Sequence, residues 1–387
     1  MTTEKFISRR LGFKGKMAII AIAVSFFVMI VAVAVSGGFR QEIRNGVSSI
    51  TGDVLLTGSD FNYYSEDTPV SSSPSYLGEL EAVRGVESIS GAIYRAGIIK
   101  AGDDIHGVLF KGVEDFGDST LLARIPSKLS ELLKLQPGDE MLSYFVGEKV
   151  KARKFKVEEI YESLVETDES LIVYVPLDDL RRVNGWEEGQ VSALEVRLGD
   201  EYKSRRAIKE KTSEIGTICL MSATEEEDGM IATASVDKYS QLFDWLDLID
   251  FNVVAILLLM TVVAGFNMIS GLLIMLFRNI STIGTLKALG MADKSIAGVF
   301  LLVSARIVAM GLAIGNALAL LFCLIQGKTH LLKLNPENYF VSFVPVSVDL
   351  PLIITADIIS FILIMLLLLI PSLFIAKVDP AQTVKAE

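Results

Sequence analysis

Residues 17–36 read MAIIAIAVSFFVMIVAVAVS and contain no charged side chain. A helix needs about 20 apolar residues to cross a hydrocarbon core of roughly 30 Å, so this run is long enough to span a membrane. Three more apolar runs come much later, from about Ile249 to Phe277, Ile296 to Gln326 and Leu350 to Ala376. The sequence therefore predicts four transmembrane helices in a one-plus-three arrangement, with a large domain inserted between helices 1 and 2.

The lysine and arginine residues outside these runs indicate which way the helices point. If the helices alternate, one face carries three segments with these residues, namely 1–16, 278–295 and 377–387. Positive charge marks the cytoplasmic face, so we expect both termini in the cytoplasm of an inner-membrane protein. Residues 37–248 and the loop 327–349 are then periplasmic. A cleaved signal peptide is the alternative for residues 17–36, but its apolar part is usually only about 7–15 residues long.

The region between the first two helices is strongly acidic. It holds 39 of the 47 acidic residues of a chain whose net charge is −11, but only 23 of its 36 basic residues. Nucleic acids and anionic lipid surfaces bind basic patches, so neither is expected as a partner of this region. An acidic surface is compatible with a soluble basic partner.

Short apolar runs bounded by turn residues alternate here with helical patterns, which predicts an α+β domain in one or two lobes. Residues 37–50 are expected to continue the first helix, because Ile43, Val47 and Ile50 recur at helical spacing. A strand follows at Val54–Leu56. Further strands are expected at 93–100, 107–111, 141–146, 155–161, 171–175 and 193–198. Further helices are expected at 76–84, 128–135, 177–183, 202–214 and 235–247.

Residue patterns typical of catalysis do not occur in this sequence. His106 and His330 have no Cys or His at metal-ligand spacing, and Cys219 and Cys323 fall in different segments, so no disulfide is expected. The stretch GFKGK at 12–16 resembles a phosphate-binding loop but lacks the preceding strand. We therefore expect a non-catalytic chain with no metal or cofactor of its own. If ATP drives this protein, another subunit hydrolyses it.

Polar residues inside the apolar runs are candidates for function, because charge is costly in a bilayer. Asn267 is expected to form an interhelical hydrogen bond. Arg306 and Asp357 lie at depths that permit an ion pair, although snorkelling or separate partners are favoured. Gly311 and Gly315 form a small-residue face suited to close helix packing.

The loop between the second and third helices reads FRNISTIGTLKALGM at 277–291. Its residues Ile280, Ile283, Leu286 and Leu289 form one apolar edge of a short helix that Gly290 ends. Such a helix can lie in the membrane interface or insert into a groove on a soluble protein.

This loop resembles that of the FtsX/MacB-type permeases of ABC transporters, which have a MacB-like periplasmic domain. Within that superfamily the chain is similar to the LolC/LolE subunits of lipoprotein-releasing systems. The similarity extends to AGFNMISGLLIM at 264–275, NYFVSFVPV at 338–346, the ending 371–387 and the order of segments at 132–146 and 155–168. One departure is Thr282, which stands where an acidic residue is usual.

The resemblance implies mechanotransmission, in which a cytoplasmic LolD-like ATPase dimer binds ATP and Mg²⁺ and pushes the loop. The residues implied in ATPase coupling are Arg278, Ile280, Thr282, Ile283, Gly284, Leu286, Lys287, Leu289 and Gly290. A carrier-docking segment is implied at Glu162, Ser163, Leu164, Val165, Glu166, Thr167 and Asp168, as a position without a recognisable docking sequence. Other implied partners are a second permease protomer (identical or a paralogue), a lipoprotein, a LolA-like carrier and membrane lipids.

Three alternatives remain open at this point. A MacB-like exporter would work with an outer-membrane channel or adaptor. An FtsX-like regulator of cell-wall hydrolases generally has a smaller outer domain. A receptor or enzyme anchor would have no ATPase partner.

Overall fold

The computed structural model describes residues 16–64, 68–101, 104–117, 119–147, 149–163, 171–224, 227 and 229–372. The chain divides into two compact units. Unit 1 comprises Met1–Arg40, Leu246–Lys333 and Phe343–Glu387, and unit 2 comprises Gln41–Trp245 and Leu334–Ser342. The predicted tail 377–387 lies outside the described residues.

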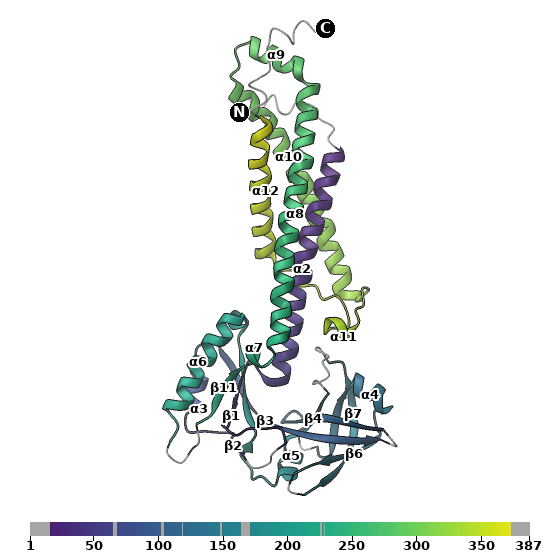
Figure 1. The fold of residues 1–387 in the computed structure, drawn as a ribbon, viewed down its shortest axis with the longest axis vertical. Coiled ribbons are helices and arrows are strands. Elements are labelled where there is room, and N and C mark those ends of the chain that lie inside the picture. The colour runs from purple at the N-terminus through teal and green to yellow at the C-terminus, as the bar shows by residue number, and fades with distance from the viewer. Residues whose placement is uncertain are drawn as a thin grey trace. The chain divides into compact units, whose positions relative to one another are not determined.

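The described part of the chain has four helices that are long and apolar enough to cross a membrane, one near the N-terminus and three in the C-terminal part (Figure 1). They are α2 (Lys16–Thr51), α8 (Ser240–Arg278), α10 (Asp293–Thr329) and α12 (Leu350–Ser372). This confirms the predicted one-plus-three arrangement. The first apolar run lies inside a longer helix, because α2 continues without a break to Thr51, as the helical spacing of Ile43, Val47 and Ile50 predicts.

The inner faces of the four helices form one apolar core in unit 1. Its buried members include Phe26 of α2, Met268 of α8, Phe300 of α10 and Ile364 of α12. Outward-facing residues such as Phe266 are apolar as well. Helices that are apolar all round are expected where lipid surrounds the protein.

Two glycines of α10 allow close contact with α2. A Cβ atom added at Gly311 would lie 2.6 Å from Cγ2 of Ile22, and one added at Gly315 would lie 2.6 Å from the carbonyl oxygen of Ala23. No larger side chain fits without a shift of α2 or α10. The small-residue face predicted for the third span is therefore confirmed, and its partner is the first span.

Nine strands of unit 2 form a sheet in the order β11-β1-β10-β3-β4-β8-β5-β7-β6. Their bounds are β1 Val54–Thr57, β3 Val86–Ala101, β4 Asp104–Val113, β5 Leu122–Pro126, β6 Glu140–Phe145, β7 Lys151–Tyr161, β8 Ile172–Pro176, β10 Ala193–Leu198 and β11 Ile231–Ala234. The short strands β2 (Val70–Ser71) and β9 (Gln190–Val191) form a separate pair.

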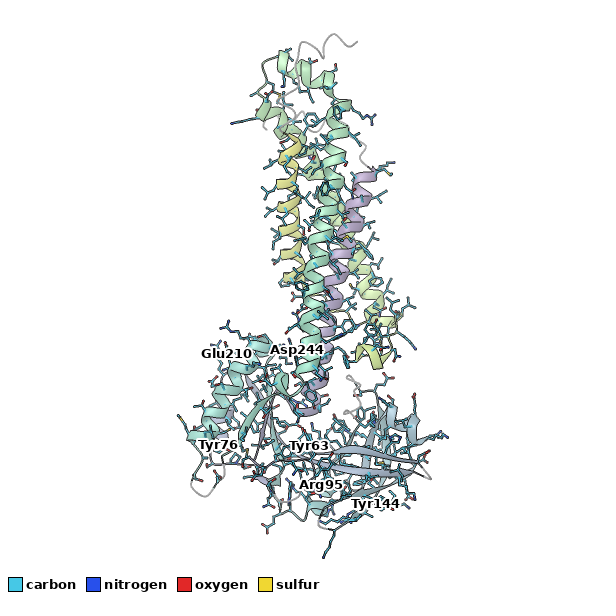
Figure 2. The ribbon with its side chains drawn as sticks, in the orientation of Figure 1. Tyr63, Tyr76, Arg95, Tyr144, Glu210 and Asp244 are labelled. Carbon is cyan, nitrogen blue, oxygen red and sulfur yellow. The ribbon has the colours of Figure 1, made fainter. Side chains whose placement is uncertain are left out.

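The long strand β3 connects two parts of unit 2. Its residues 86–92 pair with β10, and residues 93–101 pair with β4. Because β3 also pairs with β6, the strands from β3 to β6 close into a ring. Phe110, Phe145 and Phe155 are buried there, with ring centroids 4.8 and 5.7 Å apart. The fully buried Arg95 of β3 donates to the carbonyl oxygen of Val146 at 2.9 Å (Figure 2).

The helices of unit 2 are short apart from α6. They are α3 (Leu77–Glu81), α4 (Ser127–Leu133), α5 (Leu177–Asn184), α6 (Arg205–Met221), α7 (Ser235–Lys238) and α11 (Pro336–Tyr339), with a 3-10 turn at Asp200–Tyr202. Each strand and helix predicted in this region is present, which confirms the α+β class. Strand β3 begins at Val86 rather than 93, α6 ends at Met221 rather than 214, and the predicted helix 235–247 is divided between α7 and the start of α8. The short strands β2, β5, β9 and β11 were not predicted, because runs such as LARIP and IATA show no clear alternation.

Candidate functional site

The loop between α8 and α10 contains the predicted short helix, α9 (Ile280–Ala288). The amide of Asn279 donates to the carbonyl oxygen of Met275 at 2.8 Å, which helps to end α8. After α9, the backbone N–H of Met291 donates to the carbonyl oxygen of Leu286 at 3.0 Å, and Gly290 has φ +87°. A positive φ favours glycine, so the stop predicted at Gly290 is present.

The apolar edge predicted for α9 is divided between two faces. Ile283 is buried in the core of unit 1, and Leu286 packs against that core. Leu289, by contrast, is 79% exposed, and Ile280 is 37% exposed. The Lys287 ammonium lies 2.9 Å from Asp293 at the start of α10. Ile283, Gly284, Leu286 and Lys287 thus hold α9 against the spans.

The other residues named for coupling remain accessible. Exposed side chains or backbone are found at Arg278, Ile280, Thr282, Leu289 and Gly290. Another protein could contact these five, and Ser281, Thr285 and Ala288 of the same loop are exposed as well. Their role in ATPase coupling stays a prediction.

The segment predicted to dock a carrier follows β7. Glu162 is exposed and Ser163 is half-buried. Leu164, Val165, Glu166, Thr167 and Asp168 lie outside the described residues, so the structure says nothing about docking.

The hydrogen-bond partner of Asp357 is Asn316 rather than Arg306. Asp357 on α12 accepts a hydrogen bond from the Asn316 amide on α10. Arg306 lies ten positions before Asn316 on α10, about 15 Å along a helix. Asn267 is exposed, and within the described part of the chain it makes no hydrogen bond to another helix. The reason is its angular position on α8, where Ala264 and Met268 occupy the buried face.

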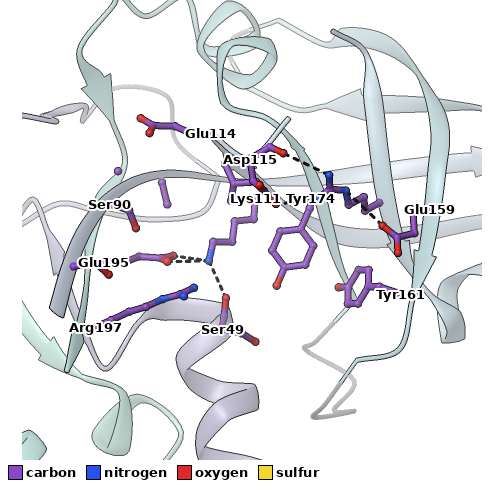
Figure 3. A pocket seen from close by; sticks show the side chains of 15 residues that line it. Ser49, Ser90, Lys111, Glu114, Asp115, Glu159, Tyr161, Tyr174, Glu195 and Arg197 are labelled. Atoms are coloured by element: carbon purple, nitrogen blue, oxygen red, sulfur yellow. Dashed lines mark hydrogen bonds and ion pairs between the residues drawn. The ribbon is translucent and has the colours of Figure 1, made fainter. Parts of the chain in front are cut away.

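The end of α2 in unit 2 is held by buried polar side chains that the sequence did not reveal. The Lys111 ammonium donates to the carbonyl oxygens of Ser49 at 3.1 Å and Ile50 at 2.8 Å, both in the last turn of α2 (Figure 3). It also lies 2.7 Å from the carboxylate of Glu195 on β10. The carbonyl end of a helix carries partial negative charge, so an ammonium group stabilises it.

Tyr94 of β3 completes this anchor from the neighbouring strand. Its hydroxyl donates to the carbonyl oxygen of Ile50 at 2.8 Å and also contacts Glu195. Burial raises the pKa of Tyr94 well above its ordinary value, and the negative charge of Glu195 acts in the same direction. Burial lowers the pKa of Lys111, whereas Glu195 opposes that change.

Lys238 ties the start of the second span to the same place. It ends α7, two residues before α8, and its ammonium lies 5.1 Å from the Tyr63 ring centroid and 5.9 Å from that of Tyr94. It also forms a hydrogen bond with the Tyr63 hydroxyl. Burial lowers the pKa of Lys238 to about 8. We call Tyr94, Lys111, Glu195 and Lys238 the helix anchor.

Backbone hydrogen bonds between strands also connect the end of α2 with the segment before α8. The strand β1 follows α2, β11 precedes α7, and the two strands are antiparallel neighbours with Val54 opposite Ala234. In unit 1, α2 and α8 are also linked directly, since Ser36 donates to Asp250 at 2.6 Å and Arg40 forms an ion pair with the same carboxylate. Helices α2 and α8 are thus tied together in both units.

A cavity of about 620 Å³ lies beside the anchor. Lys111, Glu195, Tyr161, Tyr174 and Arg124 are among its lining residues (Figure 3). Its charges are largely matched inside the chain, since Arg124 pairs with Asp115 at 3.0 Å and with Glu158 at 3.2 Å. Among the described residues no group of His, Cys, Asp or Glu could hold a metal ion. The arrangement holds backbone in place and carries no evident chemistry.

The four apolar helices define a multi-pass membrane protein. Residues 254–380 match the family model described as the FtsX-like permease C-terminal domain. This region contains α9, α10, α12 and most of α8, so these helices are similar to an FtsX-like permease C-terminal domain.

Comparison with other proteins adds similarities of fold. No curated protein matches the chain. Among solved structures, it is similar to the periplasmic region of MacB from Actinobacillus actinomycetemcomitans, with 15% identity, a TM-score of 0.31, and 49% of this chain and 91% of that chain covered. It is also similar to the extracellular domain of the noncanonic ABC-type transporter YknZ from Gram-positive bacteria, with 14% identity, a TM-score of 0.29, and coverage of 46% and 97%.

Proposed function

We propose that this permease releases lipoproteins from the inner membrane to a periplasmic carrier, with ATP hydrolysed by a partner subunit. The observation that carries the mechanical part is the path of α2. This helix is continuous from Lys16 to Thr51, and its last turn is fixed by Lys111 to Glu195 in the sheet of unit 2. A movement of the end of α2 would thus be passed to the sheet of unit 2.

The input to this path is α9. Its exposed residues, Leu289 and Ile280 above all, would contact the ATPase, and its buried residue Ile283 would pass the displacement to the core of unit 1. Helices α2 and α8 would respond together, because Asp250 and the β1–β11 pair connect them. The chain's own residues supply no nucleotide site in this scheme.

The choice of lipoprotein as cargo is supported by the segments 264–275 and 338–346, which resemble those of LolC/LolE. In unit 2, the second segment brings Phe340 against Trp245 near the start of α8, with ring centroids 5.5 Å apart. The segment thus belongs to the moving part of the scheme. Unit 2, on the periplasmic side, would present the lipoprotein to its carrier.

The test uses spheroplasts depleted of this chain and supplied with a soluble carrier. Release of radiolabelled lipoprotein should stop on depletion and return with the wild-type chain. The variant Leu289→Asp should fail to restore release and should lose the ATPase on purification. Leu331→Asp, at a residue that is 72% exposed in the loop between α10 and α12, should restore release.

Two results would count against the proposal in different ways. Undiminished release after depletion would remove lipoprotein as the cargo, and an outer-membrane channel among the co-purifying proteins would then indicate a MacB-like exporter. Absence of any co-purifying ATPase from the wild-type protein would contradict the role of α9 as its contact.

A further inference from the structure

Within the described residues Asn316 on α10 is the one hydrogen-bond partner of Asp357 on α12, and Asp357 is buried whereas Asn316 is half-buried. Asp357 is 8% exposed, and one of its carboxyl oxygens accepts from the Asn316 Nδ2 group. The other carboxyl oxygen, Oδ1, is buried without a hydrogen-bond partner, and so is Oδ1 of Asn316. If Asp357 is ionised, both of these oxygen atoms can only accept, and each is left without a donor.

The Asp357–Asn316 pair lacks one hydrogen-bond donor. An ionised carboxylate only accepts, whereas a carboxylic acid has one O–H donor. A carboxylic acid and a carboxamide can form a reciprocal pair, in which the amide N–H donates to one carboxyl oxygen and the acid O–H donates to the amide oxygen. One hydrogen on Asp357 thus supplies the donor that this site lacks.

The scarcity of charged residues around Asp357 also favours its neutral form. The four apolar runs hold three residues with a charge-bearing side chain, namely Arg306, Asp357 and, at the edge of the second run, Asp250. Among the described residues no lysine or arginine forms an ion pair with Asp357. A separate buried polar contact of α12 is neutral, because the Thr261 hydroxyl donates to the Ser360 hydroxyl at 3.2 Å. An isolated charge inside the hydrocarbon region of a bilayer is unfavourable.

We propose that Asp357 is a proton-binding site inside the membrane, and that its neutral carboxyl group forms a reciprocal pair with Asn316 that joins α10 to α12. The pair has no net charge as long as the proton is bound. This site is independent of the cargo and requires only that α10 and α12 span the membrane.

Infrared difference spectroscopy of the full-length permease with its ATPase in lipid vesicles tests the proposal. A protonated carboxyl group has a C=O stretch above the amide I band, and this band moves to lower frequency in D₂O. Wild type minus Asp357→Asn should show one such band at neutral pH. Asn316→Leu should move that band to higher frequency, because the carbonyl loses its hydrogen bond.

The outcomes separate the possible states of the site. No band that depends on Asp357 would overturn the proposal, since an ionised carboxylate, for example one bridged by a water molecule, gives none. A band that Asn316→Leu leaves unmoved would contradict the pairing. Asp357→Asn is close in size to the native residue and can form an amide pair with Asn316, so its spectrum does not depend on a disrupted fold.

Discussion

A Cβ atom added at Gly38 would clash with the backbone of another segment. It lies in α2, and the backbone of Pro345 passes so closely that a Cβ atom would be 2.4 Å from both the carbonyl carbon and oxygen. The neighbouring residue Ser347 donates its N–H to the carbonyl oxygen of Ala34 at 2.9 Å. Segment 345–347 is thus fastened to α2 at a position that only glycine allows.

Gly38→Ala should therefore lower the stability of unit 1 by roughly 1–3 kcal/mol, the usual cost of overpacking. The measurement is the thermal unfolding midpoint of the detergent-purified chain. Gly271→Ala is the matched control, because its added carbon would meet only the Ala18 Cβ at 3.7 Å, and alanine favours a helix. Equal midpoints for the two variants would show that segment 345–347 yields easily.

Lys238 gives unit 2 a dependence on pH with a definite sign. Burial lowers its pKa from 10.5 to about 8, so between these values the unfolded chain binds more protons than the folded one. Below pH 8 the ammonium is charged in both states and its burial is unfavourable, and stability rises with pH from 8 to 10.5. The gain attributable to Lys238 is at most about 3.5 kcal/mol, at about 1.4 kcal/mol per pKa unit.

Chemical unfolding of wild type and Lys238→Met across this range would measure the effect. The difference in free energy of unfolding between the two proteins should shift in favour of wild type as pH rises from 8 to 10.5. A difference that stays constant would mean that Lys238 is not desolvated in the folded chain.

Among the structural elements, the end of α2 depends on a buried ion pair. The side chains of Lys111 and Glu195 are only 2% and 3% exposed, so removing one partner leaves a buried charge alone. Lys111→Met should destabilise unit 2 by about 3–5 kcal/mol. Hydrogen exchange should quicken at residues 49–53, where α2 ends.

The double variant Lys111→Met with Glu195→Gln removes both charges and serves as the control. It should be more stable than Lys111→Met alone, because the cost of an unpaired carboxylate is then absent. A double variant less stable than either single one would indicate that the two residues act separately.

The elements also show where sequence reasoning succeeds. The spans and the continuation of α2 follow from apolar length and from the spacing of Ile43, Val47 and Ile50, which are properties of adjacent residues. The helix anchor does not follow from adjacent residues, since Lys111 and Glu195 are 84 positions apart in the sequence and are brought together only by the sheet. The one local signal was a charged residue inside each of the apolar strands VLFKGV and ALEVRL.

The candidate site shows the same division. Gly290 and the helix before it were predictable, because a turn and its stop are local. The division of the apolar edge of α9 into a buried and an exposed face was not predictable. Ile283 and Leu289 are both apolar and differ only in that the spans cover Ile283 and leave Leu289 exposed. The position of Asn316 opposite Asp357 depends on how α10 and α12 pack, which no pattern within one helix contains.

At the scale of the whole molecule, the one-plus-three arrangement requires unit 2 and the α9 loop to lie on opposite sides of the membrane. The two native cysteines, Cys219 and Cys323, are buried, so single introduced cysteines can be labelled against a low background. Tyr64 and Leu289 are suitable positions, because their side chains are 74% and 79% exposed.

A membrane-impermeant maleimide should label Tyr64→Cys in intact spheroplasts and label Leu289→Cys only after the membrane is disrupted. Leu331→Cys, between the third and fourth spans, should behave as Tyr64→Cys does, because two spans separate the loops that carry them. Labelling of Leu289→Cys from outside would reverse the orientation inferred from lysine and arginine, and α9 could then not meet a cytoplasmic ATPase. Labelling of Tyr64→Cys without Leu331→Cys would instead remove one of the spans from the membrane.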